Sequence, residues 1–171
     1  MPELAVTAVG ADRPGIVARV TGVLFEHGGN LEDSTMTILG GHFAIMLLVS
    51  TDTDPALLEE ALRTATADLG LVVTVRRVGE GTATPSPTHV VSVYGPDRPG
   101  IVHEVTTALA ALDVNVTDLE TRVLGDDRPV YALVLECALP DGVTPGEVEA
   151  AVADKAPDVD VSVHPLEVES F

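Results

Sequence analysis

The sequence predicts an α+β protein made of two ferredoxin-like sandwiches in tandem, each a four-stranded antiparallel sheet with two helices on one face. Two observations lead to this prediction: one stretch of sequence occurs twice, and each copy shows the same order of strand and helix periodicities. Composition is a third, because 46% of the residues are hydrophobic and only 3% are aromatic. Aliphatic residues suit small two-layer domains, since β-branched residues favour strands and Ala and Leu favour helices.

The repeat begins at Gly10 and again at Gly95, and half of its positions are identical without a gap. GADRPGIVARVTGVLFEHGGNLED in the first copy corresponds to GPDRPGIVHEVTTALAALDVNVTD in the second. Repetition of this kind predicts two similar domains. The Gly-, Pro-, Ser- and Thr-rich segment between the copies is typical of a linker. We therefore expect a first domain over residues 1–78, a linker over 79–88 and a second domain over 89–171.

Each copy shows the same series of elements, β-α-β-β-α-β. Apolar residues first alternate, as in a strand, and then recur at helical spacing. Gly40-Gly41 is a hairpin signal between two strand-like runs, and Asp54-Pro55 begins a second helix. Its counterpart begins with the capping box Thr144-Pro145-Gly146-Glu147. Right-handed crossovers then give a ferredoxin-like sandwich. We expect strands at 30–39, 42–50, 71–78 and 159–164, and inward helix residues Ile16, Val20, Val23, Leu24, Leu58 and Leu62.

One strand in each copy is apolar on both faces. In the first copy, Phe43, Ile45, Leu47 and Val49 alternate with Ala44, Met46 and Leu48. Residues 130–135 repeat this pattern in the second copy. Helices cover only one face of such a sheet, and a soluble monomer rarely exposes a contiguous apolar patch. The second face could be covered by packing of the two sheets within one chain or by a second chain, and we expect a homodimer.

The net charge of −18 makes several classes of partner improbable. Nine basic residues are dispersed among 27 acidic ones and form no basic cluster. Nucleic-acid binding requires Lys and Arg to displace counterions from phosphates, so direct contact with nucleic acid or with an anionic membrane is not expected. No stretch approaches the ~20 apolar residues that span a bilayer, and the N-terminus does not resemble a signal peptide. We expect a cytoplasmic protein.

Catalytic and metal-binding motifs are missing from the sequence. It contains no nucleophile elbow, phosphate-binding loop or dinucleotide fingerprint, and its five histidines lack ligand spacing. The single cysteine, Cys137, excludes an internal disulfide and lies in an apolar run, where a buried and inert thiol is expected. We therefore predict no enzyme activity, no catalytic residue, no metal and no cofactor.

The segment Asp-Arg-Pro-Gly occurs in both copies where the first strand gives way to the first helix. Pro14 restricts the residue before it, which predicts Arg13 as the N-cap and Pro14 as the first helical residue. A helix N-terminus presents unpaired N–H groups and a partial positive charge, which suit a small carboxylate or phosphate. The next strand begins at Asn30 and is expected to lie beside this turn. Such a site would suit a free α-amino acid, and the alternative is a plain strand-to-helix turn.

The segment DRPGIV, followed by a helix and by a strand that begins with Asn30, resembles the ACT domain. The tandem arrangement is similar to ACT proteins of the glycine-cleavage-system transcriptional repressor type. The resemblance implies a regulatory protein that senses a small amino acid, glycine or serine, and acts through a protein partner, with a role in glycine or one-carbon metabolism. The ligand-binding residues that it implies are Asp12, Pro14, Gly15 and Asn30 in the first copy, and Asp97, Pro99, Gly100 and Asn115 in the second.

Two other interpretations stay open. The same module resembles the N-terminal regulatory region of formyltetrahydrofolate deformylases, which carry a separate catalytic domain. The chain could also be a dimerisation or interaction module without a ligand. The two copies differ just before the predicted asparagines, with Gly28-Gly29 in the first and Asp113-Val114 in the second. One of the two sites could therefore be degenerate.

Overall fold

The computed structural model describes residues 1–79 and 83–167, and the chain divides into two compact units, Met1–Thr82 and Ala83–Phe171. Residues 80–82 of the expected linker, and 168–171 of the expected second domain, lie outside the described residues. The backbone N–H of Thr88 donates to the carbonyl of Cys137 (2.8 Å), so the end of the expected linker is bonded to the second sheet. The domain boundaries at 78 and 89 stay a prediction.

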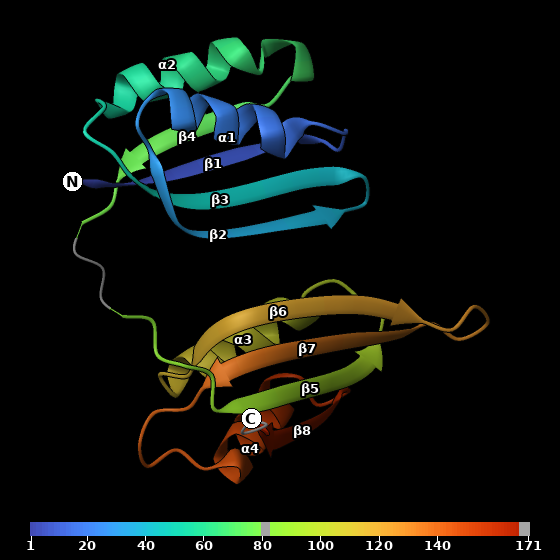
Figure 1. Cartoon of the computed structure of the whole chain (residues 1–171). Helices are drawn as coiled ribbons and strands as arrows, with labels where there is room; N and C mark the ends of the chain where they lie inside the picture. Colours follow the sequence, from blue (N-terminus) through green and yellow to red (C-terminus); the bar gives the residue numbers. More distant parts are fainter. Residues whose placement is uncertain (80–82, 168–171) are drawn as a thin grey trace. The chain divides into compact units, whose positions relative to one another are not determined.

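The first unit is a four-stranded antiparallel sheet with both helices on one face (Figure 1). The sheet order is β2-β3-β1-β4. Gly40 and Gly41 both have left-handed φ angles (56° and 80°), which close the predicted hairpin between β2 and β3. The elements are β1 (Glu3–Ala11), α1 (Ile16–Glu26), β2 (Asn30–Leu39), β3 (His42–Ser50), α2 (Pro55–Ala65), a short 3-10 helix (Ala67–Leu69) and β4 (Val72–Arg77).

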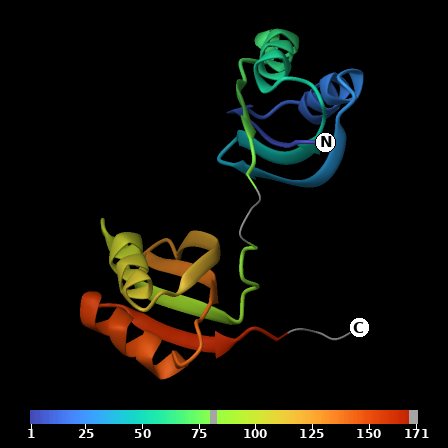
Figure 2. The same ribbon diagram turned by 90° about the vertical axis from the view of Figure 1, so that its left-hand side faces the viewer.

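The second unit repeats this architecture, with the sheet order β6-β7-β5-β8. Its helices again cover one face of the sheet (Figure 2). The elements are β5 (His89–Pro96), α3 (Ile101–Ala111), β6 (Asn115–Leu124), β7 (Val130–Ala138), α4 (Pro145–Lys155) and β8 (Asp160–Pro165). The prediction of two α+β, ferredoxin-like sandwiches in tandem is confirmed.

Capping residues begin the second helix of each unit as predicted. Asp54 accepts a hydrogen bond from the N–H of Ala56 (2.9 Å) at the start of α2. At the start of α4, Thr144 and Glu147 form a reciprocal capping box. The predicted inward helix residues Ile16, Val20, Val23, Leu24, Leu58 and Leu62 are all buried. In the described part of the chain, no helix has the length and apolar character needed to cross a membrane.

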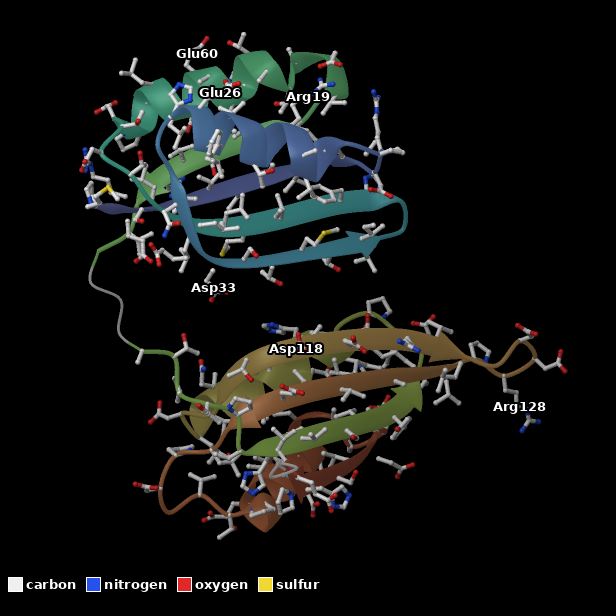
Figure 3. The ribbon with its side chains drawn as sticks, viewed as in Figure 1. Arg19, Glu26, Asp33, Glu60, Asp118 and Arg128 are labelled. Atoms are coloured by element: carbon white, nitrogen blue, oxygen red, sulfur yellow. The ribbon has the colours of Figure 1, made fainter. Side chains whose placement is uncertain are left out.

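The edge strands β2 and β6 each contain a bulge, between Leu31 and Asp33 and between Val116 and Asp118. The hairpins that follow differ in length. Leu39 pairs with His42 across two glycines, whereas the loop between β6 and β7 covers residues 125–129. Arg128 lies at the tip of this longer loop (Figure 3). The two copies therefore share the bulge and differ at the hairpin.

The doubly apolar strand β3 divides its side chains between the two faces of its sheet, as predicted. Phe43, Ile45, Leu47 and Val49 are buried beneath the helices. Met46 lies on the opposite face and is 50% exposed. Helices α1 and α2 cover only the first of these faces (Figure 1).

Candidate ligand-binding loops

The segment between β1 and α1 is a tight turn that precedes the helix. Gly15 has φ 89° and ψ −2°, and Gly100 in the second unit has φ 93° and ψ −8°. These angles are typical of the third residue of a type II turn, in which proline suits the second position. Helix α1 therefore begins at Ile16 with Gly15 as its N-cap, and the prediction of Arg13 as the N-cap is wrong. Pro14 therefore belongs to the turn and not to the helix. Gly15, the next residue of the turn, must be left-handed, and glycine adopts that conformation readily.

The N-terminus of α1 is open. Within residues 1–79 and 83–167, no side chain caps it, and its first turn contains no acidic residue. A Cβ atom built on Gly15 would meet no described atom within 4 Å. The N–H of Asp12 donates to the carbonyl of Gly41 (2.9 Å), which fixes the loop against the β2–β3 hairpin. The first N–H groups of α1 can therefore donate hydrogen bonds to an anion, and the helix dipole favours negative charge there.

The N-terminus of α3 is occupied by side chains of the chain itself. Arg98 donates to Glu104, in the first turn of α3, through Nη1 to Oε1 (3.1 Å) and Nη2 to Oε2 (2.7 Å). Arg98 also holds Asp158 through Nε (2.7 Å) and Nη2 (2.8 Å). A Cβ atom on Gly100 would have Oε1 of Glu104 at 3.8 Å and Nη1 of Arg98 at 4.0 Å. We call Arg98, Glu104 and Asp158 the ionic clamp.

The ionic clamp carries one more negative charge than positive charge. Hydrogen bonds from Arg98 hold the pKa of both Asp158 and Glu104 below the usual range. Hydrogen bonds to Asp158 and to Glu104 in turn raise the pKa of Arg98. All three groups are therefore ionised at neutral pH. An anion that approaches α3 meets two carboxylates, whereas one that approaches α1 meets none in the first turn of the helix.

The equivalent arginine of the first loop has weaker contacts. Nη1 of Arg13 donates to the backbone carbonyl of Asp68 at 3.3 Å. The carboxylate of Asp68 pairs instead with Arg19 of α1, which occupies the position of Glu104 in the repeat (Figure 3). The hydrogen bond from Arg19 lowers the pKa of Asp68. The first loop therefore has two guanidinium groups near one carboxylate, the reverse of the charge balance in the ionic clamp.

Asn30 and Asn115 lie at the opposite end of their sheets from the loops. Asn30 pairs with Ser50, whose other neighbour is Glu3 at the start of β1, whereas the loop follows the end of β1. At ~3.4 Å per residue, the length of β1 separates them by about 27 Å. The expectation that the second strand begins beside the turn is wrong, because α1 carries the chain back along the sheet before β2 starts.

The side chain of Asn30 is engaged within its own end of the sheet. Its Nδ2 donates to Oε1 of Glu32 (2.8 Å), and Oγ of Ser50 donates to the same oxygen (2.7 Å). The hydrogen bonds from Ser50 and Asn30 lower the pKa of Glu32. Six of the eight predicted ligand residues are thus brought together in the two loops, and the two asparagines are not. The six are Asp12, Pro14 and Gly15 in the first loop, and Asp97, Pro99 and Gly100 in the second.

The second loop lines an open pocket of about 820 Å³. His103 and Thr106 of α3 and Tyr131 of β7 complete it, and the sequence interpretation did not include them. Thr106 could have been found, because it repeats Thr21 in the first copy. Tyr131 reaches the loop only through its pairing with Gly95, a contact distant in sequence. The pocket residues are Asp97, Arg98, Pro99, Gly100, Ile101, Val102, His103, Thr106 and Tyr131.

Two antiparallel sheets, each with two helices on one face and a glycine turn ahead of the first helix, define a tandem of ferredoxin-like domains. Models of the ACT domain match residues 3–76 and 89–144. The chain belongs to the ACT domain family and consists of two ACT domains in tandem.

Similarity to known proteins extends over most of the chain. The glycine cleavage system transcriptional repressor of Escherichia coli is 34% identical over 121 residues, 70% of this chain and 64% of that protein. Phosphoserine phosphatase SerB2 of Mycobacterium tuberculosis is 30% identical over 168 residues, 94% of this chain and 40% of that protein. A crystal structure of an unknown protein from Galdieria sulphuraria has a TM-score of 0.80 at 30% identity, covering 97% of this chain and 99% of its own. The chain therefore spans less than two thirds of the length of the two named relatives.

Proposed function

We propose that this chain is a regulatory protein that senses a small amino acid and acts through contact with a protein partner. Its two ACT domains and its similarity to the E. coli repressor support this proposal. The observation that carries it is the open N-terminus of α1, beside Asp12, Pro14 and Gly15. Glycine or serine would place its carboxylate on the first N–H groups of α1. Asp12 lies in the same loop, and its carboxylate would accept hydrogen bonds from the ammonium group of the ligand.

The charge of the chain and the state of Cys137 support a non-catalytic role. Burial raises the pKa of the Cys137 thiol to about 11, so the thiol stays protonated at neutral pH and is a poor nucleophile. The net charge of −18 repels the phosphates of nucleic acid. Transcriptional control of the kind implied by the E. coli relative would then require a protein that itself binds DNA.

The second loop is the weaker candidate site. Glu104 and Asp158 already occupy the donors of Arg98 beside Gly100, and their charge opposes a carboxylate ligand. Asn30 and Asn115 each lie far from the loop of their own domain, so as ligand residues they would have to serve a loop other than their own.

Calorimetric titration of the full chain with glycine, serine and the other amino acids tests the proposal. We expect one ligand to bind, and at 100 times its dissociation constant it should stabilise the fold by ~2.7 kcal/mol. Arg19→Glu places in the first loop the carboxylate that the second loop has in Glu104. This variant should weaken binding roughly 10-fold or more through like-charge repulsion.

Two matched variants complete this experiment. Arg19→Gln removes the same positive charge without adding a carboxylate, so it should weaken binding less than Arg19→Glu. Glu104→Gln removes a carboxylate from the second loop and should leave the first site unchanged. Absence of binding by all twenty amino acids would contradict the proposal and favour an interaction module without a ligand. Equal affinity of Arg19→Glu and of the unmodified chain for the ligand would mean that the ligand does not bind at the first loop.

A further inference from the structure

The first sheet has an uncharged surface on the face away from α1 and α2. Cross-strand pairing arranges these side chains in rows, for example Thr35 beside Met46, Met46 beside Thr7, and Thr7 beside Thr74. We call this surface the first open face. It consists of Ala5, Thr7, Val9, Thr35, Thr37, Ala44, Met46, Leu48, Val72 and Thr74, all of them uncharged.

The first open face is largely apolar at its centre. The hydroxyl groups of Thr7 and Thr74 hydrogen bond to each other, which leaves fewer polar groups to be satisfied from outside. Val9 is 49% exposed and Val72 is 69% exposed. Thr7, Val9 and Met46 help to line a shallow groove of about 240 Å³ on this face. Contiguous apolar exposure of this kind marks an interaction surface.

Charged residues border the first open face without entering its centre. Arg76 pairs with Ala5, and Asp33 pairs with Leu48 at the opposite edge of the same row. Figure 3 shows Asp33 on β2, projecting away from the helices. An uncharged centre with a charged rim is the usual arrangement of a protein–protein interface.

The equivalent face of the second sheet carries four charged side chains at positions that are uncharged in the first, one of them on the central strand β7. Glu120 stands at the position of Thr35, and Arg122 at that of Thr37. Glu136 stands at the position of Leu48, and Asp160 at that of Val72. We call this surface the second open face. The same fold therefore presents one face with an uncharged centre and one face on which charges replace several of those uncharged residues.

We infer that the first open face is covered by the first open face of a second copy of this chain, sheet on sheet across a two-fold axis. Each uncharged face then meets an uncharged face, so no like charges oppose each other at the centre. The rest of the chain is strongly acidic, with a net charge of −18, and would repel a second copy at most other approaches. A surface with the charges of the second open face would instead place Glu136 or Asp160 against apolar groups, which is costly.

The area of the first open face is sufficient for a stable dimer. The four strands contain nine, ten, nine and six residues, which at ~3.4 Å per residue and ~4.8 Å spacing present roughly 550 Å² per copy. Two copies together would bury somewhat more than the ~1,000 Å² that distinguishes specific interfaces from incidental contacts. This inference does not depend on amino-acid binding, since the first loop lies outside this surface.

Sedimentation equilibrium of the full chain and of three single variants tests the inference. We expect the unmodified chain to have twice the 17.8 kDa chain mass at micromolar concentration. Leu48→Glu and Thr35→Glu each copy a residue that the second sheet already has, Glu136 or Glu120, so both should fold. Each variant places one charge per copy in the interface, and we expect the dimer dissociation constant to rise roughly 100-fold or more. The matched control Val134→Glu adds a charge to the second open face and should leave the dimer intact.

A monomeric chain and a dimer formed through the second sheet would each give a different sedimentation result. A monomeric unmodified chain would overturn the inference, as would a dimer that both Leu48→Glu and Thr35→Glu leave unchanged. A dimer dissociated only by Val134→Glu would place the interface on the second sheet and would equally overturn it. Circular dichroism of each variant separates loss of association from loss of folding.

Discussion

The two Asp-Arg-Pro-Gly loops have the same backbone and opposite electrostatics. Gly15 and Gly100 have nearly the same left-handed angles, so both loops enter their helices through the same turn. Four positions further along the repeat, Arg19 and Glu104 reverse the charge beside the helix N-terminus. The first loop therefore keeps its helix end open to an anion, and the second fills that end with the ionic clamp. A shared motif thus fixes the geometry of the loop, while residues outside the motif decide what it can bind.

The largest expected difference between the copies concerns the residue opposite the loop glycine. Phe43 pairs with Gly10 and is 1% exposed, whereas Tyr131 pairs with Gly95, lines the pocket and is half-buried. Phe43→Ala should cost about 3–5 kcal/mol because it leaves a cavity in the core. Tyr131→Ala should cost clearly less, because its side chain already borders solvent. Chemical denaturation monitored by hydrogen exchange in each unit measures the loss of unfolding free energy in each variant. Equal losses would contradict the expected difference between the two positions.

A smaller, opposite pair of effects is expected where each first helix ends. Gly28 has φ 65°, and Asp113 at the equivalent position has φ 55°, the single positive φ outside glycine among the described residues. Gly28→Ala should destabilise the first unit by about 1 kcal/mol, since a Cβ is strained there. Asp113→Gly should stabilise the second unit by up to about 1 kcal/mol by relieving the same strain. Thermal unfolding of the two variants checks these signs, and two changes of the same sign would contradict the equivalence.

The smallest expected effect comes from the ionic clamp, because its members are partly exposed and solvent screens them. Hydrogen bonds from Arg98 lower the pKa of Glu104 from 4.5 and that of Asp158 from 3.8. Pairing with Arg98 therefore stabilises the fold fully at pH values above these ordinary pKa values. That stabilisation is lost as the pH falls through the lowered folded-state values, because the carboxylates become protonated. Arg98→Met should make the decline in second-unit stability between about pH 5 and pH 3 shallower. An unchanged slope in acid titrations followed by circular dichroism would mean that the clamp contributes nothing measurable.

Local signals in the sequence predicted most of the fold. Gly40-Gly41 fixed the spans of β2 and β3, and Thr144 with Glu147 marked the start of α4, because hairpin turns and capping boxes depend on neighbouring residues. The hydrophobic periods likewise identified the buried faces of the helices.

The candidate site was only partly predictable. Arg98 meets Asp158 across a long stretch of chain, and no local pattern links an exposed arginine to one of many acids. The position of Asn30 could not be predicted from local sequence, because it depends on α1 carrying the chain back to the other end of the sheet before β2 starts. The N-cap could not be predicted from the sequence, because Pro14 suits both the first helical position and the second position of a type II turn, and only the angles of Gly15 distinguish them.

The regular pairing beyond the bulges in β2 and β6 limits where a gene of this kind can change length. Beyond the bulge, alternate side chains of β2 face the helices and the open face in a fixed phase, with Met36 opposite Ile45 and Thr35 opposite Met46. Glu32 is the extra residue of the bulge, so its loss would join Leu31 and Asp33 in an uninterrupted ladder. A one-residue shift of the regular ladder would instead turn every later side chain of the strand to the wrong face. Extra codons at the hairpin tip leave the pairing unchanged, and the longer loop at 125–129 is such a difference. Insertions and deletions in this protein should therefore accumulate at the hairpins and linker and be eliminated within the regularly paired parts of the strands.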